Sequence, residues 1–334
     1  MRSLDSILVT GGCGFIGANF IHHLIGSPDF DGKIINFDKL TYAADPSYLA
    51  DIADKHAGKR YFFEKIDITD AAALKRGIEK YDIDTIVHFA AESHVDRSID
   101  GPAAFIYTNV IGTFNLLEAA RSVWSGRNDV LFHHVSTDEV FGSLDAEGYF
   151  SEETAYDPRS PYSASKASSD HLVRAYYHTY GLPVTISNCS NNYGPFQHTE
   201  KLIPLMIRNM IDGKPLPVYG DGKNIRDWLF VEDHVSAIQA IIKQGREGET
   251  YTIGGENEWE NITLVNRLCD IVAAASGRNA AELKALITFV ADRLGHDQRY
   301  AIDCSKIKNE LNWHPSVSFQ EGLERTVSWY LGRL

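Results

Sequence analysis

The chain has 334 residues, of which 44% are hydrophobic and 23% charged, so it has enough apolar material for one large or two modest packed domains. No apolar run reaches the roughly 20 residues needed to cross a bilayer, and the N-terminus runs into a predicted strand rather than a secretory leader. A formal net charge of −13, without a long basic block, argues against nucleic acid as a partner. We therefore expect a cytoplasmic protein with no membrane or nucleic-acid partner.

The four cysteines are Cys13, Cys189, Cys269 and Cys304. They are widely spaced and lack the paired spacing of metal ligands. This pattern predicts buried free thiols in a reducing compartment and no metal site.

Short apolar runs alternate with longer amphipathic stretches through about the first 190 residues. The runs predict strands at 6–10, 33–38, 85–90, 130–135 and 183–187. The amphipathic stretches predict helices at 15–25, 71–80, 108–122 and 163–180. Strict alternation of strand and helix predicts an α/β fold with a doubly wound parallel (Rossmann) sheet, whose ligands lie at the carboxyl ends of the strands.

After about residue 190 the chain changes to segments separated by proline and glycine. Helices are predicted near 201–211, 232–244, 263–275 and 319–331. We expect a Rossmann domain at 1–190 and a smaller, mixed substrate-binding lobe at 191–334 that closes over it. Chain crossings between the two lobes are compatible with this division.

A glycine-rich turn follows the first predicted strand and opens the first predicted helix. Gly11, Gly14 and Gly17 stand in the context in which such a motif indicates dinucleotide binding. Glycine lets backbone N–H groups approach a pyrophosphate at a helix N-terminus, where the helix dipole favours negative charge.

Residues at the ends of later strands fit the remainder of a dinucleotide. Asp38 ends the second predicted strand, where a carboxylate accepts hydrogen bonds from a ribose diol and repels a 2′-phosphate. This position favours NAD over NADP, although the cation of Lys39 beside it weakens the preference slightly. Asp67 and Ile68 follow a further strand and are placed to meet the adenine edge.

Tyr162 and Lys166 are four residues apart and lie on one face of a predicted helix. A phenol with a pKa of about 10 is a poor base at neutral pH, but a nearby ammonium and a positive nicotinamide ring stabilise its phenolate. Tyr162 can then accept a hydroxyl proton as a hydride leaves carbon. Such a pair is common by accident on helices, and it becomes a strong indication only after a nucleotide-binding half.

The run Thr137-Asp138-Glu139 lies just past a predicted strand, on the ligand side of the sheet. Thr137 is placed to hydrogen-bond the hydroxyl that Tyr162 deprotonates. Asp138 and Glu139 are compatible with a simple turn cap. Alternatively, different environments separate their pKa values, which leaves one protonated donor and one ionised acceptor. The second interpretation suits removal of a proton beside a carbonyl and departure of a hydroxyl.

These motifs resemble those of the extended short-chain dehydrogenase/reductase superfamily. The run Thr137-Asp138-Glu139 and the segment 88–98 closely resemble the dTDP-glucose 4,6-dehydratase family. The resemblance covers nearly the whole chain, with further matching segments at 188–195, 200–204, 226–228 and 292–296. Departures are mild: Cys13, Phe141 and Leu294 stand where alanine, tyrosine and proline are usual. Leu294 bears on the shape of a substrate loop rather than on the chemistry.

The resemblance implies a hydro-lyase of deoxysugar biosynthesis that converts dTDP-glucose to dTDP-4-keto-6-deoxyglucose and water. Tyr162 would deprotonate the C4 hydroxyl while tightly bound NAD accepts the C4 hydride. Glu139 would remove the C5 proton, Asp138 would protonate the departing C6 hydroxyl, and the hydride would return to C6. The implied catalytic residues are Thr137, Asp138, Glu139, Tyr162 and Lys166.

The resemblance and the motifs together give two sets of ligand residues and imply a homodimer through the helices near 108–122 and 163–180. For the substrate, the guanidinium of Arg226 offers a planar fork of donors suited to a diphosphate. The cofactor set is Gly11, Gly14, Phe15, Ile16, Gly17, Asp38, Lys39, Leu40, Thr41, Asp67, Ile68, Phe89, Ala90, Ala91, Ser93, Thr108, Tyr162, Lys166 and Asn192. The substrate set is Ser93, Thr137, Asn191, Lys201, Leu202, Pro217, Val218, Tyr219, Arg226, Asn261, Asp292, Arg293, Leu294, Gly295 and His296.

Three alternatives remain at this point. A UDP-glucose 4,6-dehydratase would use similar chemistry, and one methyl group on the pyrimidine is worth only about 1–3 kcal/mol. A nucleotide-sugar epimerase or decarboxylase would share the glycine turn and the Tyr162/Lys166 pair, but it does not need both acids. A non-catalytic NAD sensor has no reason to keep Tyr162, Lys166, Asp138 and Glu139 together.

Overall fold

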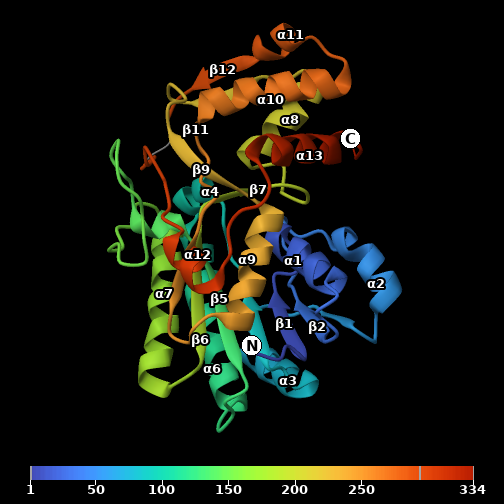
Figure 1. Cartoon of the computed structure of the whole chain (residues 1–334), viewed down its shortest axis with the longest axis vertical. Helices are drawn as coiled ribbons and strands as arrows, with labels where there is room; N and C mark the ends of the chain where they lie inside the picture. The colour runs from blue at the N-terminus through green and yellow to red at the C-terminus, as the bar shows by residue number, and fades with distance from the viewer. Residues whose placement is uncertain (1, 293–294, 334) are drawn as a thin grey trace.

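A seven-stranded parallel sheet with helices on both faces forms the larger part of the computed structural model, which describes residues 2–292 and 295–333 (Figure 1). The strands lie in the order β10-β6-β5-β4-β1-β2-β3. Their bounds are β1 (Ser6–Thr10), β2 (Lys33–Phe37), β3 (Tyr61–Glu64), β4 (Thr85–His88), β5 (Leu131–Thr137), β6 (Val184–Cys189) and β10 (Thr250–Ile253). The predicted doubly wound fold is confirmed, and its winding reverses between β1 and β4, where such sheets bind ligands.

Helices cover both faces because the central strands are apolar on both sides. On one face, Ile7 and Val9 of β1 pack with α1 (Phe15–Gly26) and α9 (Val231–Gln244). On the other face, Leu8 packs in a cluster with α3 (Ala71–Tyr81), α6 (Thr113–Val123) and α7 (Pro161–Tyr180). Successive side chains of β1 therefore anchor opposite layers.

Short helical segments lie between the longer elements of the chain. They are η1 (Pro46–Leu49), α2 (Ala50–His56), α4 (Val95–Asp100), α5 (Pro102–Phe105), η2 (Ile106–Gly112), η3 (Asp138–Phe141) and α12 (Ser305–Leu311). The helix predicted at 108–122 is thus composite, because a π-helical segment, η2, precedes α6.

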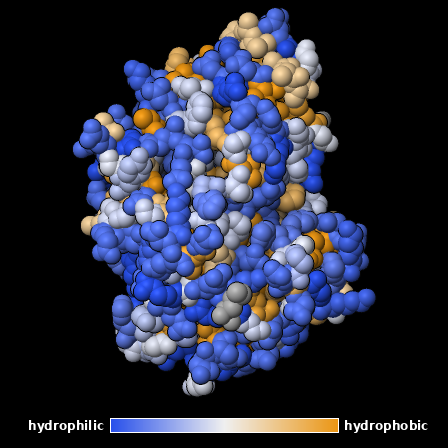
Figure 2. Space-filling model, viewed as in Figure 1, coloured by the Kyte–Doolittle hydropathy of each residue, from blue (hydrophilic) through white to orange (hydrophobic). Residues whose placement is uncertain are grey.

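The second lobe holds two small sheets and its own apolar core. One sheet is mixed, with β9 (Ile225–Phe230) between β11 (Glu258–Glu260) and β7 (Asn191–Tyr193), and the other pairs β8 (Leu216–Tyr219) with β12 (Ile287–Val290). The helices of this lobe are α8 (Leu202–Asp212), α10 (Asn261–Ser276), α11 (Ala280–Lys284) and α13 (Phe319–Leu331). Figure 2 shows mainly hydrophilic residues on the face seen in Figure 1, with more hydrophobic groups toward the end that holds α10 and α11.

The chain crosses between the lobes after residue 190. Strand β10 pairs with β6 at the edge of the large sheet, and α9 packs beside α1. The division into 1–190 and 191–334 stays a prediction. Among the described residues, no helix combines the length and the apolar character that a membrane span requires.

Helix α7 carries Tyr162 and Lys166, and its first turn is firmly fixed. The Ser160 hydroxyl accepts a hydrogen bond from the Ser163 N–H at 3.0 Å, and the Ser163 hydroxyl accepts one from the Ser160 N–H at 3.0 Å. This capping box satisfies two backbone donors, and Pro161 at the first helical position has its φ already set for a helix.

We predict that Ser160→Ala lowers the free energy of unfolding by about 1 kcal/mol, because it leaves a helix-terminal N–H without its acceptor. Urea unfolding followed by circular dichroism measures the change. The control is Ser168→Ala, whose exposed hydroxyl only donates to the Ala164 carbonyl one turn earlier in α7, and for which a change within about 0.5 kcal/mol is expected. Equal losses for both variants would contradict the role of the cap.

Candidate active site

A cavity of about 310 Å³ opens at the carboxyl ends of the central strands. It is bounded by the segments that follow β1, β2, β4, β5 and β6, together with the start of α7 and the loop before α8. Predicted residues that line it are Gly11, Gly14, Phe15, Ile16, Gly17, Asp38, Lys39, Thr41, Ile68, Phe89, Ala90, Ala91, Ser93, Thr108, Thr137, Asp138, Glu139, Tyr162, Lys166, Asn191, Asn192 and Lys201. The three motifs of the sequence therefore meet in one cavity.

Other predicted residues do not line this cavity. They are Leu40, Asp67, Leu202, Pro217, Val218, Tyr219, Arg226, Asn261, Asp292, Gly295 and His296. Arg293 and Leu294 lie outside the described residues. Most of this group belongs to the second lobe, where Val218 is a core residue at 2% exposure.

Four contacts arrange predicted substrate residues of the second lobe. The Tyr219 hydroxyl lies 3.2 Å from the Asp96 carboxylate on α4, and Nδ1 of His296 lies 2.5 Å from Oδ1 of Asp292. Arg226 is buried and donates from Nη2 to the Asp297 carbonyl at 2.8 Å. Its guanidinium also lies over the Tyr300 ring, with Cζ 4.2 Å from the centroid. The contact between Tyr219 and Asp96 joins the second lobe to α4.

The glycine turn cannot accept side chains. Gly11 has φ +72°, and a Cβ there would lie 2.9 Å from the Ala90 backbone. A Cβ on Gly17 would lie 2.4 Å from the Gly11 carbonyl oxygen. Gly14 caps α1 without a side chain, so the first amides of a 12-residue helix face the cavity side. This geometry fits a pyrophosphate.

The carboxylate of Asp38 accepts hydrogen bonds from two loops at the edge of the cavity. Its Oδ2 accepts from the Cys13 N–H at 2.9 Å and its Oδ1 from the Leu40 N–H at 2.7 Å. Burial raises the pKa of Asp38, while these backbone donors and the charge of Lys39 oppose the rise. The Lys39 ammonium lies 3.3 Å from the Asp67 carboxylate, so Lys39 is engaged by an acid within the same loops.

Asp138 lies in an environment that favours its neutral form. The residue is 1% exposed, and burial, followed by the negative charge of Glu139, raises the pKa of Asp138 well above its ordinary value. Among the described residues, Oδ2 of Asp138 has no hydrogen-bond partner. The turn is capped by Thr137, whose hydroxyl accepts from the Glu139 N–H at 3.3 Å. A carboxyl whose surroundings raise its pKa in this way is suited to act as a proton donor.

Tyr162 and Lys166 are buried side by side on α7, with 8% and 4% exposure. Nζ of Lys166 donates to the Val135 carbonyl at 2.9 Å, and burial lowers the pKa of Lys166 to about 8. Burial, with the charge of Glu139 next, raises the pKa of Tyr162 well above its ordinary value. The expected stabilisation of the phenolate by Lys166 is therefore outweighed in the protein alone. A positive charge from a ligand is needed to make Tyr162 a base.

Two residues of the cavity, Gln197 and Glu200, were not predicted from the sequence. Gln197 has a buried side-chain oxygen without a partner among the described residues, as has Asn191, which was predicted. Such oxygens suit a ligand rich in hydroxyl groups. Glu200 lines the cavity and lies 3.6 Å from Arg97, although only its neighbours Lys201 and Leu202 were selected from the same segment. The folding of the loop before α8 across the cavity brings Gln197 and Glu200 to it.

No three histidine, cysteine, aspartate or glutamate side chains within the described ranges gather in a way that could hold a metal ion. All four cysteines are free and buried.

Comparison with known proteins gives a consistent family. The family model described as GDP-mannose 4,6 dehydratase matches residues 8–326. The dTDP-glucose 4,6-dehydratase of Shigella flexneri is 52% identical over 97% of this chain and 92% of its own length.

Solved structures agree with this match. The dTDP-glucose 4,6-dehydratase DesIV of Streptomyces venezuelae, solved with NAD bound, has a TM-score of 0.88 and 46% identity over 98% of this chain and 97% of its own. The Bacillus anthracis dTDP-glucose 4,6-dehydratase in complex with NAD has a TM-score of 0.86 and 47% identity, with the same coverage of both chains. The chain therefore belongs to the proteins matched by the GDP-mannose 4,6 dehydratase model and, among them, to the dTDP-glucose 4,6-dehydratase family.

Proposed function

We propose that this protein is an NAD-dependent hydro-lyase that converts dTDP-glucose to dTDP-4-keto-6-deoxyglucose and water. One observation carries the proposal: a buried Asp138, in surroundings that raise its pKa, lies next to Glu139 in the cavity that also holds Tyr162 and Lys166. Oxidation of an alcohol needs only Tyr162 and Lys166. The further acid and base serve the loss of water.

NAD fits the residues of the cavity. The close approach of Gly11 and Gly17 to neighbouring backbone leaves room only for glycine, and the start of α1 offers amides to a pyrophosphate. The carboxylate of Asp38 is positioned for the ribose diol and disfavours a 2′-phosphate. When bound, NAD supplies a hydride acceptor and, once reduced, a hydride donor, so it is regenerated in each turnover.

The side chains of the cavity divide the proton transfers. Tyr162 accepts the proton of the C4 hydroxyl, and Thr137, which hydrogen-bonds Tyr162, orients that hydroxyl. The resulting ketone acidifies C5, and Glu139 removes the C5 proton. Asp138 donates its proton to the C6 oxygen, which leaves as water. Lys166 contributes part of the positive charge that favours the phenolate, and bound NAD would contribute the rest.

The proposal also specifies the nucleotide of the substrate, which is thymidine diphosphate. Its support is the similarity to enzymes named for dTDP-glucose, at about half identity over nearly the full chain. Turnover should therefore be faster on dTDP-glucose than on UDP-glucose or GDP-mannose. Faster turnover on either of the other two would replace the assigned substrate.

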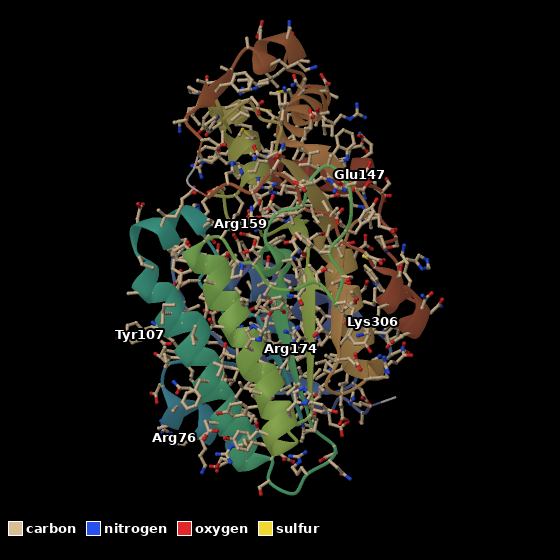
Figure 3. The ribbon with its side chains drawn as sticks, turned by 90° about the vertical axis from the view of Figure 1, so that its left-hand side faces the viewer. Arg76, Tyr107, Glu147, Arg159, Arg174 and Lys306 are labelled. Atoms are coloured by element: carbon tan, nitrogen blue, oxygen red, sulfur yellow. The ribbon has the colours of Figure 1, made fainter. Side chains whose placement is uncertain are left out.

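We also propose a cytoplasmic homodimer. The proposed dimer face comprises η2, α6 and α7, which lie next to one another (Figure 3). Large apolar side chains are exposed on it, with Tyr107 at 65%, Phe114 at 41% and Tyr180 at 53%. Tyr107 projects away from the molecule in Figure 3. An exposed apolar face of this kind is typical of an interface.

For the cofactor, we predict that Gly17→Ala lowers the NAD retained by the purified protein at least about tenfold, because the added Cβ would lie 2.4 Å from a carbonyl oxygen of the turn. NAD released by denaturation is measured against protein. Gly26→Ala, at the other end of α1, is the matched control, since a Cβ there meets nothing within 4 Å. Unchanged NAD in Gly17→Ala would contradict the assignment of this turn.

For the elimination, we predict that Glu139→Gln and Asp138→Asn each lower turnover by roughly 100- to 10,000-fold, because each loses a positioned proton carrier. The 4-keto product is followed by absorbance in strong base, and deuterium exchange at C5 by mass spectrometry in heavy water. Glu139→Gln should also lose the exchange.

The control for this pair is Glu147→Gln, an exposed glutamate that does not line the cavity. It should retain both turnover and exchange. Exchange at the wild-type rate in Glu139→Gln would show that another group is the base. Recovery of only a C4 epimer from the wild-type protein would reject dehydration.

A further inference from the structure

Asp170 is a fully buried carboxylate that none of the proposed steps uses. It lies on α7, one turn after Lys166, has 0% exposure and does not line the cavity. Its Oδ2 accepts from the Ser136 hydroxyl at 2.9 Å, the Tyr156 hydroxyl at 2.8 Å and the Asn188 amide at 3.3 Å. Burial of a charged group is costly, so such a set of donors indicates that the charge has a purpose at this place.

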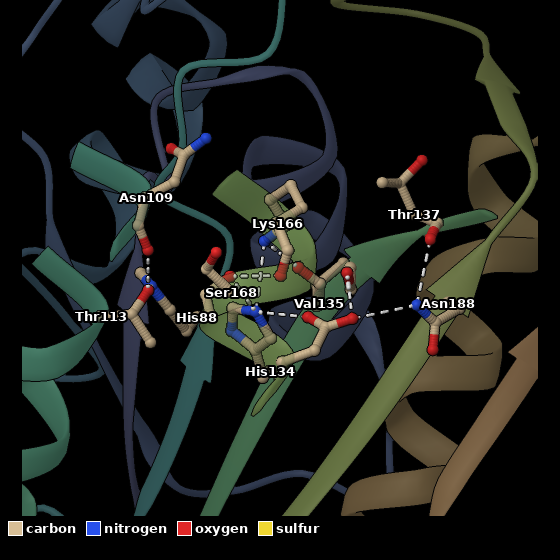
Figure 4. A network of polar contacts seen from close by, with 12 residues as sticks. His88, Asn109, Thr113, His134, Val135, Thr137, Lys166, Ser168 and Asn188 are labelled. Atoms are coloured by element: carbon tan, nitrogen blue, oxygen red, sulfur yellow. Dashed lines mark hydrogen bonds and ion pairs between the residues drawn. The ribbon is translucent and has the colours of Figure 1, made fainter. Parts of the chain in front are cut away.

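The other oxygen of Asp170 contacts a histidine that also contacts Lys166. Oδ1 lies 3.2 Å from Nε2 of His134 on β5, and the same nitrogen lies 3.3 Å from Nζ of Lys166 (Figure 4). The same ring nitrogen of His134 therefore lies close to both a carboxylate and an ammonium, and as an acceptor it can bind only the ammonium of Lys166. None of the three side chains is more than 4% exposed.

The ionisation states fit a buried ion pair with a neutral ring between its members. Burial lowers the pKa of His134 to about 4, so the ring is neutral at pH 7. Burial raises the pKa of Asp170, but the His134 contact and the charge of Lys166 outweigh this and leave it below its ordinary value. Burial lowers the pKa of Lys166 to about 8, and the negative charge of Asp170 is the largest effect that opposes it.

We propose that Asp170 is a positioning residue: its buried negative charge, beside the His134 ring that contacts Lys166, keeps the Lys166 ammonium charged, so that Tyr162 faces a positive group. The inference rests on the proposed function, in which Tyr162 is the base. Because Asp170 does not line the cavity, its action is on Lys166 and not on a ligand.

A second layer fixes Asp170 itself. Arg174, one turn further along α7, donates from Nη2 to the Tyr156 hydroxyl at 2.9 Å and to the Thr250 hydroxyl at 3.2 Å. This leaves the Tyr156 proton for Asp170. Arg174 reaches toward the surface in Figure 3, so the arrangement extends from the half-exposed outside of α7 to the cavity.

Other titratable groups lie near Tyr162, Lys166 and Asp170 on the neighbouring elements, and their own titration must be taken into account in a pH experiment. Among the described residues they are His88 on β4, His134 on β5, Asp138 and Glu139 on η3, Tyr156 in the segment before α7, Tyr162 and Arg174 on α7, and Cys189 on β6. Only Asp170 combines a negative charge with a contact to the residue that touches Lys166.

The test is the ionisation of Tyr162 in the NAD-loaded protein with Asp170→Asn. Tyrosinate absorbance is titrated with pH, and the Tyr162 component is the part lost in Tyr162→Phe. Without Asp170 the ammonium of Lys166 loses its proton at a lower pH, so the phenolate loses a positive neighbour. The midpoint of Tyr162 should then move upward by about one pH unit or more, and the alkaline limb of kcat should move to lower pH.

The direction of the shift separates the proposal from a simple charge effect. Removal of a negative charge that acted directly on Tyr162 would move its midpoint downward. A downward shift, or none, would therefore overturn the proposal. Asp170→Glu should restore part of the wild-type midpoint, because it retains the charge. If Asp170→Asn does not fold, Asp170→Ser removes the same charge and leaves room for water.

The matched control is Asp233→Asn. Asp233 is a buried carboxylate on α9 that accepts from the backbone N–H groups of Ser316 and Val317 and does not line the cavity. The Asp233→Asn variant should be less stable than the wild type, with an unchanged Tyr162 midpoint. If Asp233→Asn shifted the Tyr162 midpoint as much as Asp170→Asn does, the role of Asp170 would be only structural and the proposal would be overturned. If Tyr162→Phe removes no titrating component and retains turnover, the proposed function itself fails. If the Tyr162 component is present in the wild type and its midpoint is the same in Asp170→Asn, only the inference about Asp170 is rejected.

Discussion

Desolvation of charged side chains at the carboxyl edge of the sheet is the constraint on which the site depends. Asp138, Tyr162 and Lys166 are each less than one-tenth exposed. Withdrawal from water disfavours the charged form of each group, so the neutral acid, the neutral phenol and an easily deprotonated ammonium arise from the same cause. The chemistry then requires specific charges to be restored, by a ligand at Tyr162 and by Asp170 at Lys166.

The fold meets this requirement by bringing distant parts of the chain to one edge. Strands β4, β5 and β6 are neighbours, and the segments after them supply the floor of the cavity. Helix α7 then carries Tyr162, Lys166, Asp170 and Arg174 at one-turn spacing, so a single rigid element joins the cavity to the outside of the protein. The capping box at its start fixes the position of Tyr162, and thereby links the local stability of a helix end to the chemistry.

Much of the architecture could be predicted because the signals are local. Alternating apolar strands and amphipathic helices predicted the parallel sheet, and Gly11, Gly14 and Gly17 predicted the turn that begins α1. The place of β10 could not be predicted, since a strand that joins the sheet after a long excursion has no local mark. The composite helix of η2 and α6 was missed for a related reason, because periodicity does not distinguish one α-helix from an α-helix with a π-helical start.

In the candidate site, too, the sequence predicted several residues but not their burial or their contacts, which depend on tertiary packing. Asp138 and Glu139 were predicted from their sequence, but which of them is deprived of water depends on packing, and so does the raised pKa of Tyr162. Asp170 and His134 were not selected at all, because neither belongs to a ligand motif and their contact exists only when α7 packs on β5. Gln197 and Glu200 enter the cavity by the path of a loop.

The central claim is that Asp138 is a protonated carboxyl beside Glu139 at neutral pH. Infrared difference spectroscopy of the NAD-loaded protein against Asp138→Asn measures this directly, because a protonated carboxyl has a C=O band distinct from the carboxylate bands. The account predicts that the substitution removes one protonated-carboxyl band at pH 7, and that this band shifts in heavy water. Loss of carboxylate bands only would mean that Asp138 is ionised and would contradict its role as the acid that releases water.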